Sequence, residues 1–279
     1  MIRVGIGGWT YEPWRGAFYP PGLPHARELN YASRRLSTIE INGTFYRTQK
    51  PESFRRWAAE TPDDFVFSVK APRYATYRPR LAEAAPAIER FFASGVSELG
   101  DKLGPVLWQL PPSKRFDEAD LAAFLELLPR RLDGRPLRHA LEPRHRSFIE
   151  PRFVALLRRA EVAVAFADSD VHPSIADLTA DFVYARLQRA TDSEPSGYGP
   201  ASLDRWAERF RTWADGGEPD DLPRIGHVVT AARTPRPCFV YMIDGDKVRA
   251  PAAAMALIER LALTRSLSLA PSPGGRGSG

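Results

Sequence analysis

The sequence is short of cysteine and lysine, and it lacks long apolar runs. Its one cysteine, Cys238, excludes an intramolecular disulfide framework and a cysteine-rich zinc module, which indicates a reducing compartment. No stretch approaches the roughly 20 apolar residues that a membrane-spanning helix needs. The first residues also lack the basic and apolar segments of a secretory signal. We therefore expect a soluble, cytoplasmic protein that has no membrane partner.

Arginine carries most of the positive charge. The 279 residues include 39 basic and 34 acidic side chains, but only five of the basic ones are lysines. Guanidinium groups bind phosphate and carboxylate groups bidentately, so an anionic partner such as nucleic acid is one interpretation of the excess. The other interpretation, which we favour, is a solvated surface with a small net charge.

Short β-rich runs alternate with helical segments, which is typical of βα units around a parallel sheet. The predicted strands are 2–6, 38–41, 65–69, 106–110, 139–141, 162–167, 182–187 and 238–243. The predicted helices are 26–36, 51–60, 85–99, 117–128, 151–159, 203–213 and 252–261, with one or two turns at 173–178. This inventory predicts an α/β fold, a single-domain (β/α)8 TIM barrel over residues 1–263, with an open doubly wound sheet as the alternative.

Three segments fall outside this alternation. Residues 264–279 are rich in serine, proline and glycine, and we expect a disordered C-terminal tail. The connections 188–202 and 216–237 are longer than usual for a barrel. Each can fold over a pocket at the C-terminal face or form a surface insertion.

Polar residues stand at or after seven of the predicted strand ends. In a barrel the carboxyl ends of the strands form the active face, so we expect these side chains to converge on one pocket. The candidate substrate-binding and catalytic residues are Trp9, Tyr11, Glu40, Asn42, Tyr46, Lys70, Gln109, Glu142, Arg144, His145, Asp168, Tyr184 and Arg186.

The residue types in this set limit the chemistry. Glu40 and Glu142 can act as general acid and base, while Lys70, Arg144 and Arg186 hold an anionic substrate. Lys70 can alternatively form a Schiff base with a carbonyl if burial or neighbouring cations lower its pKa. The structural alternative is an ion-pair layer in which the cations only neutralise the carboxylates.

A metal site is a weaker hypothesis. Asp168, Asp170 and His172 follow the sixth strand, and Glu142 and His145 follow the fifth, which gives oxygen and imidazole ligands of the kind that divalent metals use. The signal is not specific, and we predict no metal.

No cofactor motif is present either. After Gly5-x-Gly7-Gly8, Thr10 and Pro13 stand where a dinucleotide fingerprint needs a third glycine and a continuing helix. A phosphate-binding loop, a His-Glu-x-x-His motif and a serine nucleophile elbow are missing from the sequence. The sequence names no cofactor.

Aromatic residues cluster in the segment after the first strand. They can stack sugars or bases, but a small satellite core under a long loop is the interpretation that we favour. The cluster consists of Trp9, Tyr11, Trp14, Phe18 and Tyr19, followed after the second strand by Phe45 and Tyr46.

Several motifs occur in a fixed order along the chain. They are Gly8-Trp9-x-Tyr11-x-x-Trp14-Arg15-Gly16-x-Phe18-Tyr19-Pro20, Glu40-Ile41-Asn42-x-Thr44-Phe45-Tyr46, Phe67-Ser68-Val69-Lys70, Gln109-Leu110-Pro111-Pro112, Glu142-x-Arg144-His145-x-Ser147, Asp168 and Tyr184-x-Arg186. Together they resemble the YecE-like family, domain of unknown function 72. The resemblance implies a TIM barrel but no reaction. The family's distant similarity to xylose isomerase and endonuclease IV barrels suggests sugar-phosphate or nucleic-acid substrates by analogy only.

The chain departs from the family pattern in three places. Gln188 and Arg189 stand where the family often has histidine and glycine, Phe148 replaces a tryptophan, and Met242-Ile243-Asp244 replaces an asparagine pair. These departures put a proton-transfer role after the seventh strand in doubt, and they indicate altered ligand contacts.

The leading hypothesis is an enzyme that acts on a small anionic or polyhydroxylated, sugar-phosphate-like substrate by carboxylate acid/base chemistry at the barrel mouth. The alternatives are a nucleic-acid-binding or phosphodiester-processing protein and a ligand-binding barrel without turnover.

Overall fold

Eight parallel strands close into a barrel in the computed structural model, of which residues 1–226, 233–243 and 247–262 are described here. The first strand pairs with both the second and the last, so the barrel has no free edge. The predicted TIM barrel is confirmed. The barrel strands are β1 (Ile2–Gly7), β2 (Thr38–Ile41), β3 (Val66–Lys70), β4 (Leu103–Gln109), β7 (His139–Glu142), β8 (Ala163–Asp168), β9 (Val183–Leu187) and β10 (Cys238–Met242).

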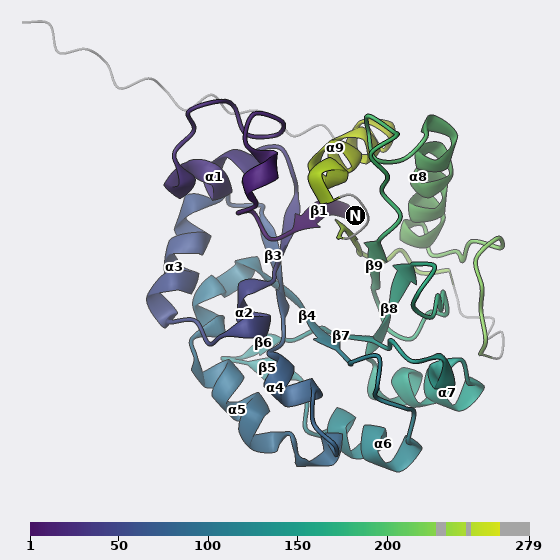
Figure 1. Ribbon diagram of the computed structural model, residues 1–279. Helices are drawn as coiled ribbons and strands as arrows, with labels where there is room; N and C mark the ends of the chain where they lie inside the picture. Colours follow the sequence, from purple (N-terminus) through teal and green to yellow (C-terminus); the bar gives the residue numbers. More distant parts are fainter. Residues whose placement is uncertain (227–232, 244–246, 263–279) are drawn as a thin grey trace, which may run out of the picture.

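Helices surround the barrel on its outside (Figure 1). Several of them begin with a proline in the first turn, where its missing N–H costs nothing. They are α1 (Glu28–Ser33), α2 (Gly43–Tyr46), α3 (Pro51–Glu60), α4 (Arg73–Thr76), α5 (Ala85–Ala93), α6 (Glu118–Glu126), α7 (Pro151–Ala160), α8 (Pro200–Ala214) and α9 (Ala250–Arg260). A short hairpin, β5 (Arg131–Leu132) and β6 (Arg135–Pro136), lies outside the barrel.

Side chains alternate between the barrel interior and the helix layer, because successive residues of a strand point to opposite faces. Leu107, Tyr184 and Tyr241 belong to the interior cluster. Trp108, the neighbour of Leu107, packs in the outer core under the helices. This alternation fixes which residues at the strand ends face inward, and therefore which ones form the site.

Two helices are shorter than the sequence predicts. The segment 85–99 leaves the α-helix at Ala93, because Gly95 adopts a left-handed conformation with φ of 98° and a 3-10 helix, Val96–Lys102, follows. The segment 26–36 begins as the 3-10 helix His25–Arg27 before α1.

The connection between β8 and β9 contains no helix, although the sequence predicts one or two turns at 173–178. Its middle part is hydrogen-bonded to the connection before β10. Ala176 donates its N–H to the Pro223 carbonyl, and the Asp177 carboxylate accepts the N–H groups of Ile225 and Gly226. The two connections therefore hold each other in place.

Each of the two long connections borders a cavity. The one after β9 lines a cavity of about 390 Å³ at the carboxyl-terminal end of the barrel. The one before β10 lines a cavity of about 760 Å³ at the opposite, amino-terminal end. Among the described residues, no helix combines the length and the apolar character that a membrane crossing requires. The predicted tail, 264–279, lies outside the described residues.

Candidate functional site

Polar side chains from four barrel strands meet inside the barrel at its carboxyl-terminal end. They occupy inward-facing positions at the ends of β2, β4, β7 and β9, or directly follow them. We call them the axial network: Glu40, Gln109, Glu142, Arg144, Tyr184 and Arg186.

Arg186 is the centre of the axial network. Its Nε and Nη2 donate to the two carboxylate oxygens of Glu40 at 3.1 and 3.0 Å, and its Nη1 donates to Glu142 Oε2 at 2.6 Å. The residue is only 1% exposed. Burial alone would lower its pKa, but the two carboxylates raise the pKa above the usual arginine value. Arg186 is therefore a permanent cation that spans the barrel interior from β2 to β7.

Glu142 is held as a carboxylate. It accepts hydrogen bonds from Gln109 Nε2 at 2.8 Å and from Arg144 Nε at 3.2 Å, besides the bond from Arg186. Burial would raise its pKa, but the guanidinium groups of Arg186 and Arg144 outweigh burial and lower the pKa to about 2. Glu142 is therefore ionised at neutral pH.

Glu40 has a third donor, the hydroxyl of Tyr184, at 2.7 Å from Oε2. Because the Tyr184 proton is committed to Glu40, Ser68 Oγ, 2.8 Å away, donates its own proton to the tyrosine oxygen. Burial and the Glu40 charge raise the pKa of Tyr184 well above its ordinary value. The tyrosine thus stays neutral and fixes the orientation of Glu40.

Lys70 ends β3 and is 6% exposed. Its Nζ lies 3.9 Å from the centre of the Phe45 ring, and among the described residues no carboxylate oxygen lies within ion-pair distance of it. Burial lowers the pKa of Lys70 to about 8, and the neighbouring Arg186 adds to this effect. Lys70 therefore releases a proton far more readily than an exposed lysine does.

Two further groups at this end have donors available. Arg144 uses its Nε on Glu142, and its side chain is partly exposed. The side-chain Nε2 of Gln188, which directly follows β9, is buried and has no hydrogen-bond partner. A buried amide donor without an acceptor is costly, and a bound molecule can supply the acceptor.

Asp168 does not join the axial network. It shares the register of Val164 and Phe166, which pack in the outer core, so its side chain points toward the helix layer. There its carboxylate lies 3.4 Å from Arg189 Nε and 3.5 Å from the Tyr198 hydroxyl. Burial raises its pKa, although the Arg189 charge opposes the rise.

The other predicted binding residues also have structural contacts outside the network. Trp9 packs edge-to-face on Trp57, and Tyr11 packs edge-to-face on Trp14. Tyr46 is 67% exposed. His145 accepts the backbone N–H of Ser147 and caps a 3-10 helix. Asn42 lies against Gly7 at the end of β1. The proposed roles of these residues in binding stay predictions.

The aromatic segment after β1 packs into the outer core under the helices and does not form the separate satellite core that we expected. Trp14, Phe18 and Tyr19 are buried and contact one another at ring-centre distances of 4.8–6.4 Å. Trp14 also donates from its indole N–H to the backbone of Lys247, near the start of α9. This contact joins the segment after β1 to the region after β10.

Ser68 and Tyr198 are not among the residues predicted for the site, and only Ser68 contacts the axial network. Ser68 orients Tyr184, and its position two residues before Lys70 places it on the same inward face. Tyr198 donates toward Asp168 from the connection after β9. No pattern in the sequence marks Tyr198, because its partner is distant in the chain.

Arginine side chains pair with three of the residues considered as metal ligands, Asp168, Asp170 and Glu142. Within 1–226, 233–243 and 247–262, no three histidine, cysteine, aspartate or glutamate side chains are grouped as metal ligands. Asp170 is paired with Arg189 at 2.7 Å. The Arg186 guanidinium fills the space between Glu40 and Glu142, so these two carboxylates do not fit a metal ion without displacing it.

Comparison with known proteins places this barrel in a family. The profile described as "Protein of unknown function DUF72" matches residues 3–276. The UPF0759 protein YunF of Bacillus subtilis is 30% identical over 159 residues, which is 55% of this chain and 54% of YunF. The UPF0759 protein YecE of Escherichia coli K12 is 30% identical over 151 residues, or 53% of this chain and 50% of YecE. The matches span about half the length of both relatives.

A solved structure agrees over a longer range. The crystal structure of a DUF72 family protein from Thermotoga maritima superimposes with a TM-score of 0.69. The alignment covers 95% of this chain and 100% of the other, at 21% identity. This likeness supports the fold, and the profile match extends over nearly the whole sequence. The chain belongs to the DUF72 family.

Proposed function

We propose that this protein is an enzyme that acts on a small anionic or polyhydroxylated substrate at the barrel mouth, with Lys70 as the residue that exchanges a proton with the substrate. The observation that carries the proposal is the position of Lys70. It is a buried amine at the carboxyl end of a barrel strand, and no described carboxylate pairs with it. With a pKa of about 8, roughly a tenth of the side chains are neutral at pH 7.

The two glutamates are better suited to positioning than to proton transfer. Glu142, whose pKa is about 2, is too weak a base to take a proton readily at neutral pH and carries none to donate. Arg186 occupies both carboxylate oxygens of Glu40, and Arg186 and Arg144 each occupy one oxygen of Glu142. We therefore assign to Glu40 and Glu142 the task of fixing Arg186 within the site, while their role as acid and base stays a prediction.

The available groups at the mouth favour a substrate rich in acceptors. Lys70 and the terminal nitrogens of Arg144 offer positive charge, and Gln188 offers an unpaired amide donor. Carboxylate, phosphate, carbonyl or hydroxyl oxygens would satisfy all three groups. The nucleic-acid alternative rests on the small positive net charge of the sequence, and the oligonucleotides in the screen test it.

The test combines a binding screen with product analysis. Wild type and Lys70→Met are screened by thermal shift against sugar phosphates, neutral sugars, hydroxy acids and oligonucleotides. A ligand of the folded state raises the apparent melting temperature. Each stabilising compound is then incubated with both proteins and analysed by mass spectrometry. We expect turnover by wild type and at least a 100-fold loss in Lys70→Met, within the range of general acid-base catalysis.

A matched control uses Lys50→Met, which changes an exposed lysine at the start of α3. This variant should keep full turnover. Product formation by Lys70→Met at the wild-type rate would refute the role of Lys70. Stabilisation without product in either protein would favour the ligand-binding barrel, and selective stabilisation by oligonucleotides would favour the nucleic-acid alternative.

A further inference from the structure

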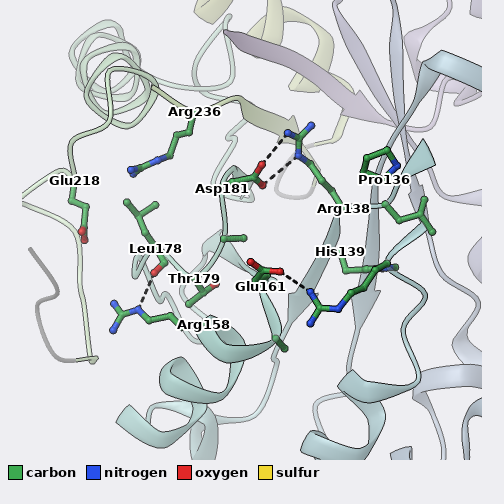
Figure 2. A pocket seen from close by; sticks show the side chains of 14 residues that line it. Pro136, Arg138, His139, Arg158, Glu161, Leu178, Thr179, Asp181, Glu218 and Arg236 are labelled. Atoms are coloured by element: carbon green, nitrogen blue, oxygen red, sulfur yellow. Dashed lines mark hydrogen bonds and ion pairs between the residues drawn. The ribbon is translucent and has the colours of Figure 1, made fainter. Parts of the chain in front are cut away.

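A second cavity lies at the other end of the barrel from the axial network. Its volume is about 760 Å³, and it is bordered by residues that precede β7, β8, β9 and β10 (Figure 2). Cavities of 300–1,000 Å³ are typical of small-molecule sites. The amino-terminal end of a TIM barrel ordinarily serves stability, so a cavity of this size there calls for an explanation from its lining.

The lining is rich in arginine. Four arginines border the cavity, from the connections before β7 and β10 and from α7, against three carboxylates. The four arginines are Arg130, Arg138, Arg158 and Arg236. Figure 2 shows Arg138, Arg158 and Arg236 on separate segments around the cavity.

Arg236 is the least compensated of them. It is only 9% exposed, and its guanidinium donates to the backbone carbonyls of Gly216 and Gly217 at 3.3 Å each. Within the part of the chain that the structure describes, no carboxylate lies within ion-pair distance of it. A cation that is removed from water and held only by two long hydrogen bonds to neutral groups favours an anion beside it.

Two other arginines are in ion pairs that can be exchanged. Arg138 binds Asp181 at 3.1 Å, and Arg130 binds Glu161 at 2.6 Å, with all four side chains more than two-fifths exposed. Such exposed pairs contribute little to stability. A multiply charged ligand can therefore take over these guanidinium groups without a large loss.

The remaining wall is apolar or neutral. Leu137, Leu178 and Ala180 contribute apolar surface. His139 accepts the indole N–H of Trp108 on Nδ1 at 3.0 Å and faces the Pro129 carbonyl with Nε2 at 2.8 Å, so it is a neutral imidazole. Burial lowers its pKa to about 4. The positive charge of the lining therefore comes from arginine alone.

We propose that this cavity binds a small polyanion, carrying phosphate or carboxylate groups, on the guanidinium groups of Arg236 and Arg138. Arginine suits this task because its planar fork matches the oxygens of either group. The site is separate from the barrel mouth, since its residues precede the strands whose opposite ends carry the axial network.

Isothermal titration calorimetry with pyrophosphate and with citrate tests the proposal and separates the two anion types. We expect saturable binding of at least one probe to the full chain at low salt. Arg236→Ala should weaken that binding by at least about tenfold, and Arg236→Lys by less, because it keeps the charge. Arg138→Ala removes an exposed ion pair and a guanidinium contact with the Phe182 ring at 5.8 Å. The fold should be preserved, and binding should weaken by about threefold or more.

Arg144→Ala is the matched control, because it removes an arginine from the barrel mouth. Binding that survives Arg144→Ala and weakens in Arg138→Ala and Arg236→Ala supports the proposal. Absence of heat with both probes would overturn it, as would binding that only Arg144→Ala weakens. Neither outcome depends on the catalytic role of Lys70.

Discussion

The two ends of the barrel use arginine in different ways. At the carboxyl-terminal end, Arg186 is 1% exposed, and all three of its guanidinium nitrogens donate to buried carboxylates. At the amino-terminal end, Arg138 has a side chain that is 44% exposed, and its partner Asp181 is 72% exposed. The comparison shows that an arginine buried against carboxylates is a fixed part of the structure, whereas one with an exposed partner, such as Arg138, or with no described carboxylate partner, such as Arg236, is available to a ligand.

The difference follows from solvation. Opposite charges attract strongly inside a protein, but taking them out of water is costly, so a buried pair is tolerated only with good geometry and full hydrogen bonding. Arg186 with its two glutamates meets that condition. An exposed pair such as that of Arg138 is screened by water and salt, and its members separate at little cost.

Glu40→Gln should give the largest loss of stability, and it tests the buried ion pairs of Arg186 at the carboxyl-terminal end. The change removes one charge from a buried pair and leaves Arg186 with less compensation, for an expected loss of about 3–5 kcal/mol in the free energy of unfolding. Urea denaturation at pH 7 measures it. The matched change at the other end, Glu161→Gln, removes the exposed partner of Arg130 and should cost less than about 1 kcal/mol. Equal losses would contradict the contrast between the two ends.

Lys70→Met should stabilise the protein at neutral pH. Burial lowers the pKa of Lys70 from 10.5 to about 8, so folding at pH 7 includes the cost of a buried cation. Removing that cation should raise the free energy of unfolding by up to about 3 kcal/mol.

The stability difference between Lys70→Met and wild type should depend on pH. Between about pH 8 and pH 10.5 the unfolded chain binds a proton that the folded chain has lost, so wild-type stability gains a contribution that rises with pH across this window. Lys70→Met lacks that contribution, and its advantage over wild type should shrink as the pH rises. Chemical denaturation of both proteins at pH 7 and pH 9.5 measures the change, and a constant difference would contradict the lowered pKa.

The smallest expected effect concerns the exposed ion pair of Arg138 and Asp181 at the amino-terminal end. A double-mutant cycle on Arg138 and Asp181, each changed to alanine, should give a coupling of about 0.2–1 kcal/mol. Raising the salt concentration from about 0.1 to about 1 M should reduce that coupling, because the pair is solvent-accessible. A coupling above about 2 kcal/mol would mean that Arg138 is a fixed structural residue, and it would weaken the proposed polyanion site.

The barrel and much of the axial network could be predicted from the sequence. The two-residue period of strands places Glu40 and Glu142 on inward faces at strand ends, and closure of the barrel then brings them together across its interior. The same period could have shown that Asp168 faces outward with Phe166. A position at a strand end does not by itself make this distinction, because successive residues point to opposite faces.

Other features depend on contacts between residues that are far apart in the chain, which no local sequence pattern indicates. The Arg186 guanidinium lies between two glutamates that are 146 and 44 residues away in the chain. The cavity at the amino-terminal end is built from four connections, and its arginines look like ordinary surface residues in the sequence. Helix ends such as Ala93 depend on a single glycine conformation.

The most direct test of the central claim is an NMR titration of the lysine side chains. The chain has only five lysines, so the resonances of isotopically labelled lysine can be assigned with Lys70→Arg. We predict one ε-methylene signal with a midpoint near pH 8, close to the value of about 8 for Lys70, and its absence from the variant spectrum. If the Lys70 signal titrates at its ordinary value of 10.5, the lysine is not the proton-exchanging group proposed for this site.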